Sequence, residues 1–450
     1  MQRSLLLLSL SLACVIGVHA QAVNQAAGGT NTPDNPTWLT PLQDLDTRLP
    51  SWLRLSGEYR ARVEDAGHIR YADTYDTYLL SRLRLKIEIR PTTWLSFVAE
   101  STDARIFFND HVASLPPNQN TWDFWQAYAE LGNDEKGWLD VKVGRQAFAF
   151  GDERVIGPSN WLNQGRTFDA VRVDLHHPGY QVSLFASSAS VSRDGVIDHH
   201  IQGNNLHGIY GSFKNILPSA TIEPYVLWRV SPGNISLSED PGLGPLNETI
   251  LGIRWVGKLS RGFDYATEMD REFGSIGPDS IHAWAGYWNL GRTFGNSWGH
   301  PRPFVEGNYA SGTNNPNSRT WGTFDQVYPS AHDKIDFADQ VGRRNVEQFR
   351  VGVGEKFGKK WTLKQTFEGI WLASARDALY NSSGSPVFRS PTGIAGRHIG
   401  NEFDIVNVYQ PNPAIQIGFG YAHLFTGAFL NKTSKGRDYN YPYLYAEYKF

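Results

Sequence analysis

The amino-acid sequence predicts an all-β protein: a transmembrane, antiparallel, up-and-down β-barrel of about 18 strands. Three observations lead to this fold class. Segments of alternating polar and apolar residues recur along most of the chain. The connections between them alternate between short and long. The chain ends on an amphipathic segment whose last residue is Phe450, an ending typical of outer-membrane barrels.

Residues 1–20 have the features of a removable signal peptide. Arg3 supplies a positive charge, 5–18 is an apolar stretch too short to span a bilayer, and Ala20 suits cleavage. The only cysteine, Cys14, lies in this segment, so the mature chain is expected to contain neither a disulfide framework nor a thiolate zinc site. We expect 21–50 to be a periplasmic N-terminal segment and 51–450 to be the transmembrane barrel.

Composition narrows the class of protein further. The formal net charge of -3 argues against a strongly basic nucleic-acid-binding protein. After residue 20, no apolar run approaches the roughly 20 residues of a membrane helix. A chain that spans a membrane without such helices must form a closed barrel, because only closure satisfies the backbone groups in lipid.

The second predicted strand shows the alternation most clearly. Leu83 and Leu85 share an apolar face, whereas Arg82 and Arg84 share the opposite face. Such a density of arginine fits a water-filled lumen better than the solvated face of a soluble sandwich. Strands are predicted to begin near Trp52, Thr77, Trp94, Asp123, Trp138, Arg166, Tyr180, Leu206, Thr221, Thr249, Phe263, Ile281, Pro303, Arg344, Trp361, Asn401, Ala414 and Tyr441.

The long connections are the candidates for extracellular loops. They are predicted at 106–121, 147–165, 231–248, 311–342 and 375–399. Segment 311–342 is the longest and combines Trp321, Phe324 and Tyr328 with glycine and asparagine. We expect it to fold inward and narrow the pore. The alternative is a loop that only caps the rim.

Cations dominate part of the predicted lumen face. A wall of guanidinium groups concentrates anions and binds carboxylates through a two-pronged fork. The alternative is a set of arginine–carboxylate ladders that brace the barrel and select nothing. The predicted pore-lining cations are Arg54, Arg60, Arg62, Arg82, Arg84, Lys86, Arg90, Arg172, Arg229, Arg254, Arg344 and Arg350.

Three stretches resemble a known family. They are GRQ at 144–146 with GDERVIGP at 151–158, GRTFDAVR at 165–172, and YASGTNNP at 309–316, which continues through 322–340. Together they are similar to the alginate export family of bacterial outer-membrane proteins.

The resemblance implies a monomeric outer-membrane barrel with an arginine-rich pore that takes part in polysaccharide secretion. The cargo it implies is alginate, a polymer of uronic acids. It adds three motif arginines to the predicted pore lining, Arg145, Arg154 and Arg166, and it matches Arg172, Asp152 and Asp169 to motif positions. The chain departs from the family pattern at Thr313, where aspartate is usual.

Strand phase conflicts with one of these positions. Alternation places Arg145 on the apolar face with Val141 and Val143. We expect a bulge at Gly144 to turn Arg145 inward, because an arginine facing lipid at mid-bilayer costs about 2–4 kcal/mol. The alternative places Arg145 beyond the edge of the bilayer.

The sequence therefore predicts a passive outer-membrane channel for an anionic polysaccharide or its oligomers, in contact with outer-membrane lipid. Neither catalytic residues nor a cofactor or metal site is predicted, although the loop acids Asp325, Asp333, Asp336 and Asp339 could hold Ca²⁺. The alternatives are a general or anion-selective porin, an outer-membrane hydrolase, and a soluble carbohydrate-binding sandwich. The identity of the polymer, the direction of transport and any periplasmic secretion partner stay open.

Overall fold

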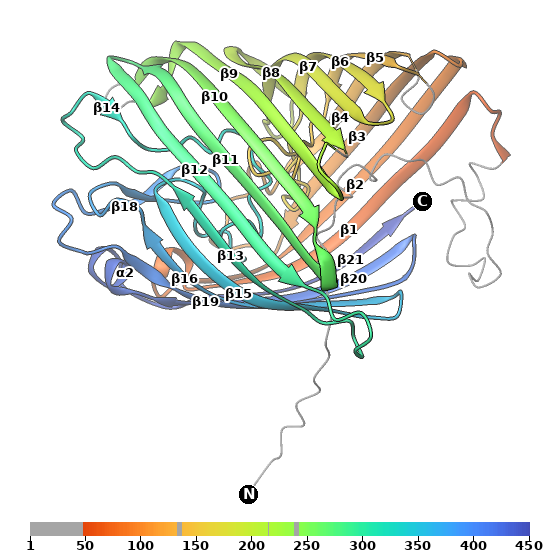
Figure 1. Cartoon of the computed structure of the whole chain (residues 1–450). Helices are drawn as coiled ribbons and strands as arrows, with labels where there is room; N and C mark the ends of the chain where they lie inside the picture. Colours follow the sequence, from red (N-terminus) through yellow and green to blue (C-terminus); the bar gives the residue numbers. More distant parts are fainter. Residues whose placement is uncertain (1–47, 133–136, 215, 238–242) are drawn as a thin grey trace, which may run out of the picture.

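The computed structural model describes residues 48–132, 137–214, 216–237 and 243–450. Eighteen antiparallel strands form a closed barrel, which confirms the predicted fold class and strand number (Figure 1). The barrel closes where β1 pairs with β21, with Tyr59 opposite Tyr448 and Val63 opposite Leu444. Closure leaves no free strand edge, as a barrel in lipid requires. The predicted signal peptide at 1–20 and nearly all of the predicted periplasmic segment lie outside the described residues.

The barrel strands follow one another in chain order. They are β1 (Leu53–Gly67), β2 (Tyr75–Thr92), β3 (Leu95–Phe107), β4 (Asn120–Gly132), β5 (Leu139–Gln146), β6 (Phe168–His177), β7 (Tyr180–Val191), β8 (His199–Lys214), β9 (Ala220–Leu237), β10 (Leu243–Lys258), β11 (Phe263–Ile276), β12 (Asp279–Arg292), β13 (Arg302–Ala310), β15 (Val346–Phe357), β16 (Trp361–Leu372), β19 (His398–Asn412), β20 (Ile415–Thr426) and β21 (Tyr439–Lys449).

The predicted strand starts differ most from the observed ones at β8 and β10. These strands begin at His199 and Leu243, rather than near Leu206 and Thr249. Both extra segments are polar or rich in glycine, so they lack the alternation that marks a strand between lipid and lumen. The predicted long loop 231–248 is therefore wrong, because β9 and β10 extend through most of it.

The connections define the two ends of the barrel. β1 begins and β21 ends at the same end, where the turns are short and the longest connection is 293–301. The opposite end carries the long connections and is the extracellular end by the rule for such barrels. Exposed Trp94, Trp138 and Trp298 lie in or beside the short turns, and Phe108 and Trp122 are exposed at the other end. These aromatics fit the girdles at the two membrane interfaces.

Small elements decorate the extracellular end. β14 (Thr320–Trp321) pairs in parallel with β12, and β17 (Ala378–Tyr380) forms a hairpin with β18 (Pro386–Arg389). Helix α2 (Ala428–Thr433), between β20 and β21, and the 3-10 turn η3 (Ile69–Tyr71) lie at the same end, whereas the 3-10 turn η4 (Ser260–Gly262) lies in a short turn at the opposite end. In the described part of the chain, no helix is long and apolar enough to cross a membrane.

Two long connections fold into the barrel, where Figure 1 shows loop segments between the front and back strands. We call 147–167, between β5 and β6, the first inner loop, and 311–345, between β13 and β15, the second inner loop. Phe148 of the first inner loop and Phe324 of the second are fully buried. Burial of these side chains against the inner face of the wall provides a hydrophobic driving force for the inward fold.

Candidate channel interior

Arginines of β1 and β2 hold the backbone of the first inner loop. Arg60 donates hydrogen bonds to the carbonyl oxygens of Asn160 at 2.9 Å, Trp161 at 3.0 Å and Leu162 at 3.1 Å. Arg82 donates to the carbonyls of Asn160 at 2.9 Å and Leu162 at 3.1 Å. Alternation along β1 and β2 places these guanidinium groups on the inner face. The loop is therefore anchored by charge acting on peptide dipoles.

Two neighbouring arginines add aromatic contacts to the same arrangement. Arg62 donates to the carbonyl of Trp161 at 2.6 Å and lies 3.9 Å from the centre of its ring. Arg84 donates to the carbonyl of Gln164 at 2.7 Å and lies 3.5 Å from the ring of Trp125. Both arrangements combine a hydrogen bond with a cation–π contact. We call Arg60, Arg62, Arg82 and Arg84 the arginine row.

Carboxylates neutralise only half of the arginine row. Glu64 pairs with Arg62, and Glu58 pairs with Arg82. Within the described ranges, no carboxylate lies at ion-pair distance from Arg60 or Arg84. Glu58 and Glu447 act on Arg60, and Glu58, Glu100 and Glu447 act on Arg84, only from longer range. In the described part of the chain, these two guanidinium groups therefore have no direct carboxylate partner.

Arg166 extends this positive region to the end of the first inner loop. It donates to the carbonyl of Pro329 at 2.8 Å and to that of Gly157 at 3.3 Å. Burial, with a smaller contribution from the charge of Arg229, lowers the pKa of Arg166 to about 10. Arg166 thus stays charged at neutral pH while it bridges the two inner loops.

Backbone hydrogen bonds join the two inner loops directly. The amide of Gly157 donates to the carbonyl of Tyr328 at 2.8 Å, and the amide of Tyr328 donates to that of Val155 at 2.9 Å. The amide of Ser330 donates to the carbonyl of Glu153 at 2.9 Å. These bonds form a short parallel bridge inside the lumen. The two loops therefore form one plug.

Trp161 lies at the junction of the plug with the wall. Its ring stacks on His332 of the second inner loop at 3.9 Å. It also meets Tyr443 of β21 edge-on at 4.8 Å. One aromatic side chain thus contacts both inner loops and the closing strand.

The second inner loop faces a wall rich in acids. The carboxylate of Glu402 on β19 accepts a hydrogen bond from the amide of Phe337 at 2.6 Å. Glu272 on β11 accepts one from the amide of Asp325 at 2.9 Å. At these two contacts the wall supplies carboxylates and the loop supplies N–H groups, the reverse of the arrangement at the arginine row.

Arg350 is the main cation on this acidic side. It pairs with Glu368, and with Glu306 at 3.1 Å. It also donates to the carbonyls of Ile335 at 2.7 Å and Asp333 at 3.1 Å. Unlike Arg60 and Arg84, this guanidinium is fully compensated by acids.

A cluster of charges connects the two inner loops near the centre of the plug. Lys334 lies 3.6 Å from Asp152 and 3.3 Å from Asp333. Burial disfavours the charged forms of Lys334 and Asp333. The acids Asp152 and Asp333 nevertheless raise the pKa of Lys334. Lys334 and Lys364 hold the pKa of Asp333 below its usual range. Arg154 pairs with Asp152 at 3.0 Å in the same cluster. All of these groups are charged at neutral pH.

Most of the predicted pore-lining cations are ion-paired. Ten of the fifteen lie within 4 Å of an acid in the described residues, which agrees with the alternative that arginine–carboxylate ladders brace the barrel. They are Arg62, Arg82, Arg90, Arg145, Arg154, Arg172, Arg229, Arg254, Arg344 and Arg350. The other predicted cations are Arg54, Arg60, Lys86, Arg84 and Arg166. Of these, Arg60, Arg84 and Arg166 hold the inner loops through carbonyl oxygens, with no acid at ion-pair distance in the described residues.

Arg145 does not turn inward, so the predicted bulge at Gly144 is wrong. The pairing of β5 with β4 and β6 runs through Gly144 without a shift in register. Gln146 and Phe168 are buried on the inner face, whereas Arg145 pairs with Asp169 at 2.8 Å on the opposite face. His200 lies 3.0 Å from the same carboxylate. An ion cluster at the extracellular ends of these strands, rather than a bulge, accommodates the charge.

The family model for alginate export matches residues 51–442. The chain belongs to the alginate export family. The resemblance inferred from the motifs is thereby confirmed. Membership and the closed barrel together place the protein in the bacterial outer membrane as a channel.

Solved outer-membrane barrels of Pseudomonas aeruginosa share the fold. OccK5 (OpdH) superposes with a TM-score of 0.59 at 10% identity, covering 88% of this chain and 98% of that chain. OccK3 (OpdO) gives 0.57 at 12% identity, covering 91% and 97%. The outer membrane protein opdK gives 0.59 at 10%, covering 88% and 98%. No curated protein sequence matches the chain.

Sequence reasoning missed three features of the interior of this alginate export family member. It did not identify Trp161 as a junction, the backbone carbonyls as partners of the arginine row, or Glu402 as a partner of the second inner loop. A carbonyl has no sequence signal, and the contacts join segments far apart in the chain. Alternation alone did not identify Glu402 as an inward-facing residue. Its position became clear from the register of β19.

Proposed function

We propose that this outer-membrane channel passively conducts an anionic polysaccharide of the alginate type, or its oligomers. The observation that carries the proposal is that Arg60 and Arg84, which have no carboxylate at ion-pair distance in the described residues, hold the first inner loop through backbone carbonyls and the side-chain oxygen of Asn160. Family membership supports the same class of cargo. The proposal assigns no catalytic residue and treats the protein as a monomer surrounded by outer-membrane lipid.

The chemistry of the arginine row suits a uronate polymer. Each uronic acid unit carries a carboxylate, which a guanidinium binds through two charge-assisted hydrogen bonds. Such bonds are roughly twice as strong as bonds between neutral groups. A carboxylate on the polymer therefore competes well against the carbonyls of Asn160 and Leu162. A neutral glycan offers no comparable exchange.

This competition supplies a mechanism for opening. When a uronate unit binds Arg60 or Arg84, the backbone of 160–164 loses the hydrogen bonds that hold it to β1 and β2. The first inner loop can then move away from the wall, and the next unit of the polymer meets the next guanidinium. No step requires an energy source beyond the gradient of the polymer.

Planar-bilayer recording of the purified full chain tests the proposal. We expect oligouronates to interrupt the current at lower concentrations than neutral oligosaccharides of the same length. Arg84→Gln should weaken the block by oligouronates. Arg302→Gln is the matched control, because it also removes one positive charge but lies beside Asp264 at 3.0 Å, far along the chain from the arginine row. Equal block by charged and neutral glycans would contradict the proposal.

A general anion-selective porin is the second candidate, because ion pairs neutralise most of the predicted cations. The two candidates differ in the response to chain length. A porin for small anions should pass monomeric uronate and chloride alike, with no stronger block as the oligomer lengthens. A polysaccharide channel should show a block that strengthens with each added uronate unit.

A further inference from the structure

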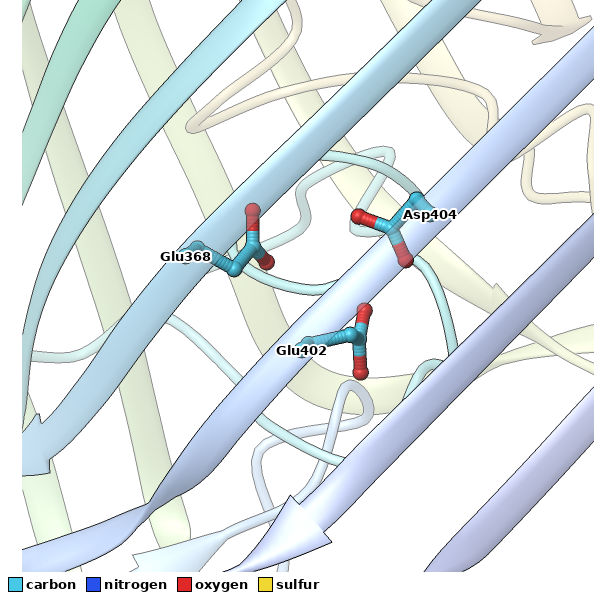
Figure 2. A group of neighbouring side chains, drawn as sticks. All are labelled: Glu368, Glu402 and Asp404. Carbon is cyan, nitrogen blue, oxygen red and sulfur yellow. The ribbon is translucent and has the colours of Figure 1, made fainter.

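Three buried carboxylates meet on the inner wall, beneath the second inner loop. Glu368 projects from β16, and Glu402 and Asp404 project from β19 (Figure 2). Glu368 is directly opposite Glu402 in the strand register, and Asp404 follows two residues later on the same face. One oxygen from each group lies within 4.8 Å of the others. All three residues are buried.

Protein partners satisfy only part of this cluster. Arg350 binds both oxygens of Glu368. The hydroxyl of Thr366 donates to one oxygen of Asp404 at 2.7 Å. The amide of Phe337 donates to one oxygen of Glu402. Arg350 is also shared with a fourth acid, so it cannot neutralise the cluster alone.

The carboxyl groups of Glu402 and Asp404 lie within hydrogen-bond reach of each other. Two oxygens of the cluster receive no hydrogen bond from any other group in the described ranges. They are Oε2 of Glu402 and Oδ1 of Asp404, and the side chains that carry them are almost completely buried. A buried carboxylate oxygen without a hydrogen bond is costly, and like charges opposite one another across a strand pair repel. Figure 2 shows the carboxylates converging on a common space. A shared proton or a bound cation in that space would relieve the repulsion between the carboxyl groups of Glu402 and Asp404.

We propose that Glu368, Glu402 and Asp404 bind a divalent cation with the size and coordination preference of Ca²⁺. The ligands are all oxygens, which hard cations prefer. Ca²⁺ accepts carboxylates in a flexible geometry, whereas Mg²⁺ demands a near-ideal octahedron and usually binds only one or two protein carboxylates. Three protein carboxylates converging on one space therefore suit Ca²⁺ better. Water completes the coordination shell.

The cation has a mechanical consequence for the plug. Glu402 offers one oxygen to the cation and the other to the amide of Phe337. A bound cation fixes the orientation of this carboxylate and so holds the second inner loop against β19. The site is distinct from the arginine row and does not depend on the identity of the transported solute.

Calcium binding to the full chain in detergent, after treatment with a chelator, tests the site. Isothermal titration with CaCl₂ should show one site per chain. Glu402→Gln keeps an oxygen for the amide of Phe337 but removes the charge, and it should weaken Ca²⁺ binding by at least about tenfold, since loss of even an outer-shell partner commonly costs that much. If this variant does not fold, Asp404→Asn makes the same test.

Glu248→Gln is the matched control. Glu248 is another buried lumen acid with an unpartnered oxygen, but it lies on β10 outside the cluster. It should leave Ca²⁺ affinity unchanged. No binding by the native protein at millimolar Ca²⁺, tighter binding of Mg²⁺ than of Ca²⁺, or equal loss in Glu248→Gln would overturn the proposal.

Amide hydrogen exchange provides a readout specific to the loop. In the native protein, Ca²⁺ should slow exchange at Phe337, and the effect should disappear in Glu402→Gln. Ca²⁺ binding that leaves the exchange of Phe337 unchanged would overturn the proposed link between the cation and the second inner loop.

Discussion

The two inner loops are anchored by different chemistry. The first inner loop presents carbonyl oxygens to the guanidinium groups of Arg60 and Arg84. The second presents amide groups to the carboxylates of Glu272 and Glu402, and its carbonyls meet Arg350, which is itself paired with acids. Because carbonyls are the partners of Arg60 and Arg84, a carboxylate in solution can displace them and bind these guanidinium groups. Anchoring through amides leaves acids that attract cations and repel an anionic polymer.

This difference assigns different tasks to the two sides of the lumen. The side formed by β1 and β2 is suited to bind an anionic polymer and release the first inner loop. The side formed by β11, β15, β16 and β19 is suited to keep the second inner loop in place.

Removal of the inward part of the second inner loop should increase conductance several-fold. Replacing 323–343 with a short glycine–serine linker keeps the barrel intact, because Ala310 of β13 already pairs with Val346 of β15. Single-channel recording is the measurement. Deletion of 314–319 is the control, since these residues are largely exposed at the rim and should not narrow the pore. Similar conductance in both variants would assign the constriction to the first inner loop.

Arg350→Gln should destabilise the barrel far more than Arg84→Gln. Loss of Arg350 leaves Glu306 and Glu368 without their buried cation, which costs about 3–5 kcal/mol in the free energy of unfolding. Loss of Arg84 leaves no carboxylate without its ion-pair partner in the described residues. We expect the free energy of unfolding to fall by about 1–3 kcal/mol, because hydrogen bonds of a charged group are lost. Urea unfolding in detergent micelles measures both. If both variants lost the same free energy of unfolding, pairing with acids would not explain a difference between the β15–β16 side and the β1–β2 side of the lumen.

Trp161→Ala should loosen the plug without opening the barrel. It removes the stack on His332 and the cation–π contact with Arg62. We expect the free energy of unfolding to fall by roughly 3 kcal/mol, the lower end of the range for truncation of a large aromatic side chain. Bilayer recordings should show more frequent opening events. Trp298→Ala, at an exposed site in a short turn, should leave gating unaltered. Unchanged gating in Trp161→Ala would show that this side chain does not join the loops functionally.

Asp198 should make a small contribution to pH dependence near the first inner loop. Burial, and a hydrogen bond with Asp123, raise its pKa from 3.8 to about 6, and its carboxyl group accepts a hydrogen bond from Gln164 at 2.8 Å. The folded protein therefore holds an extra proton between these pH values. Stability from this group is largest below pH 3.8 and falls as the pH rises to 6.

The variant Asp198→Asn isolates this contribution from other titrating groups. The difference in melting temperature between native protein and variant should favour the native protein more at pH 4 than at pH 7. A difference that does not vary with pH would show that Asp198 has the same proton affinity in the folded and unfolded states.

The sequence predicted the barrel well because strands between lipid and lumen must alternate. Strand number and closure follow from that pattern, and the least alternating segments, at β8 and β10, gave the largest errors. Partners inside the lumen could not be predicted in the same way. Glu368 and Glu402 become neighbours only through the register of β16 and β19, which are separated by a 25-residue connection at 373–397. Arg145 was misjudged because its partner, Asp169, lies on a different strand.

Block of single channels by uronate oligomers tests the central claim most directly. Native protein should be blocked more strongly by an oligouronate than by a neutral oligosaccharide of equal length, and the preference should increase with the number of uronate units. The double variant Arg60→Gln/Arg84→Gln should lose this preference while remaining a folded, conducting barrel. A native channel that does not discriminate charged from neutral oligomers, or a double variant that keeps the full preference, would contradict the account.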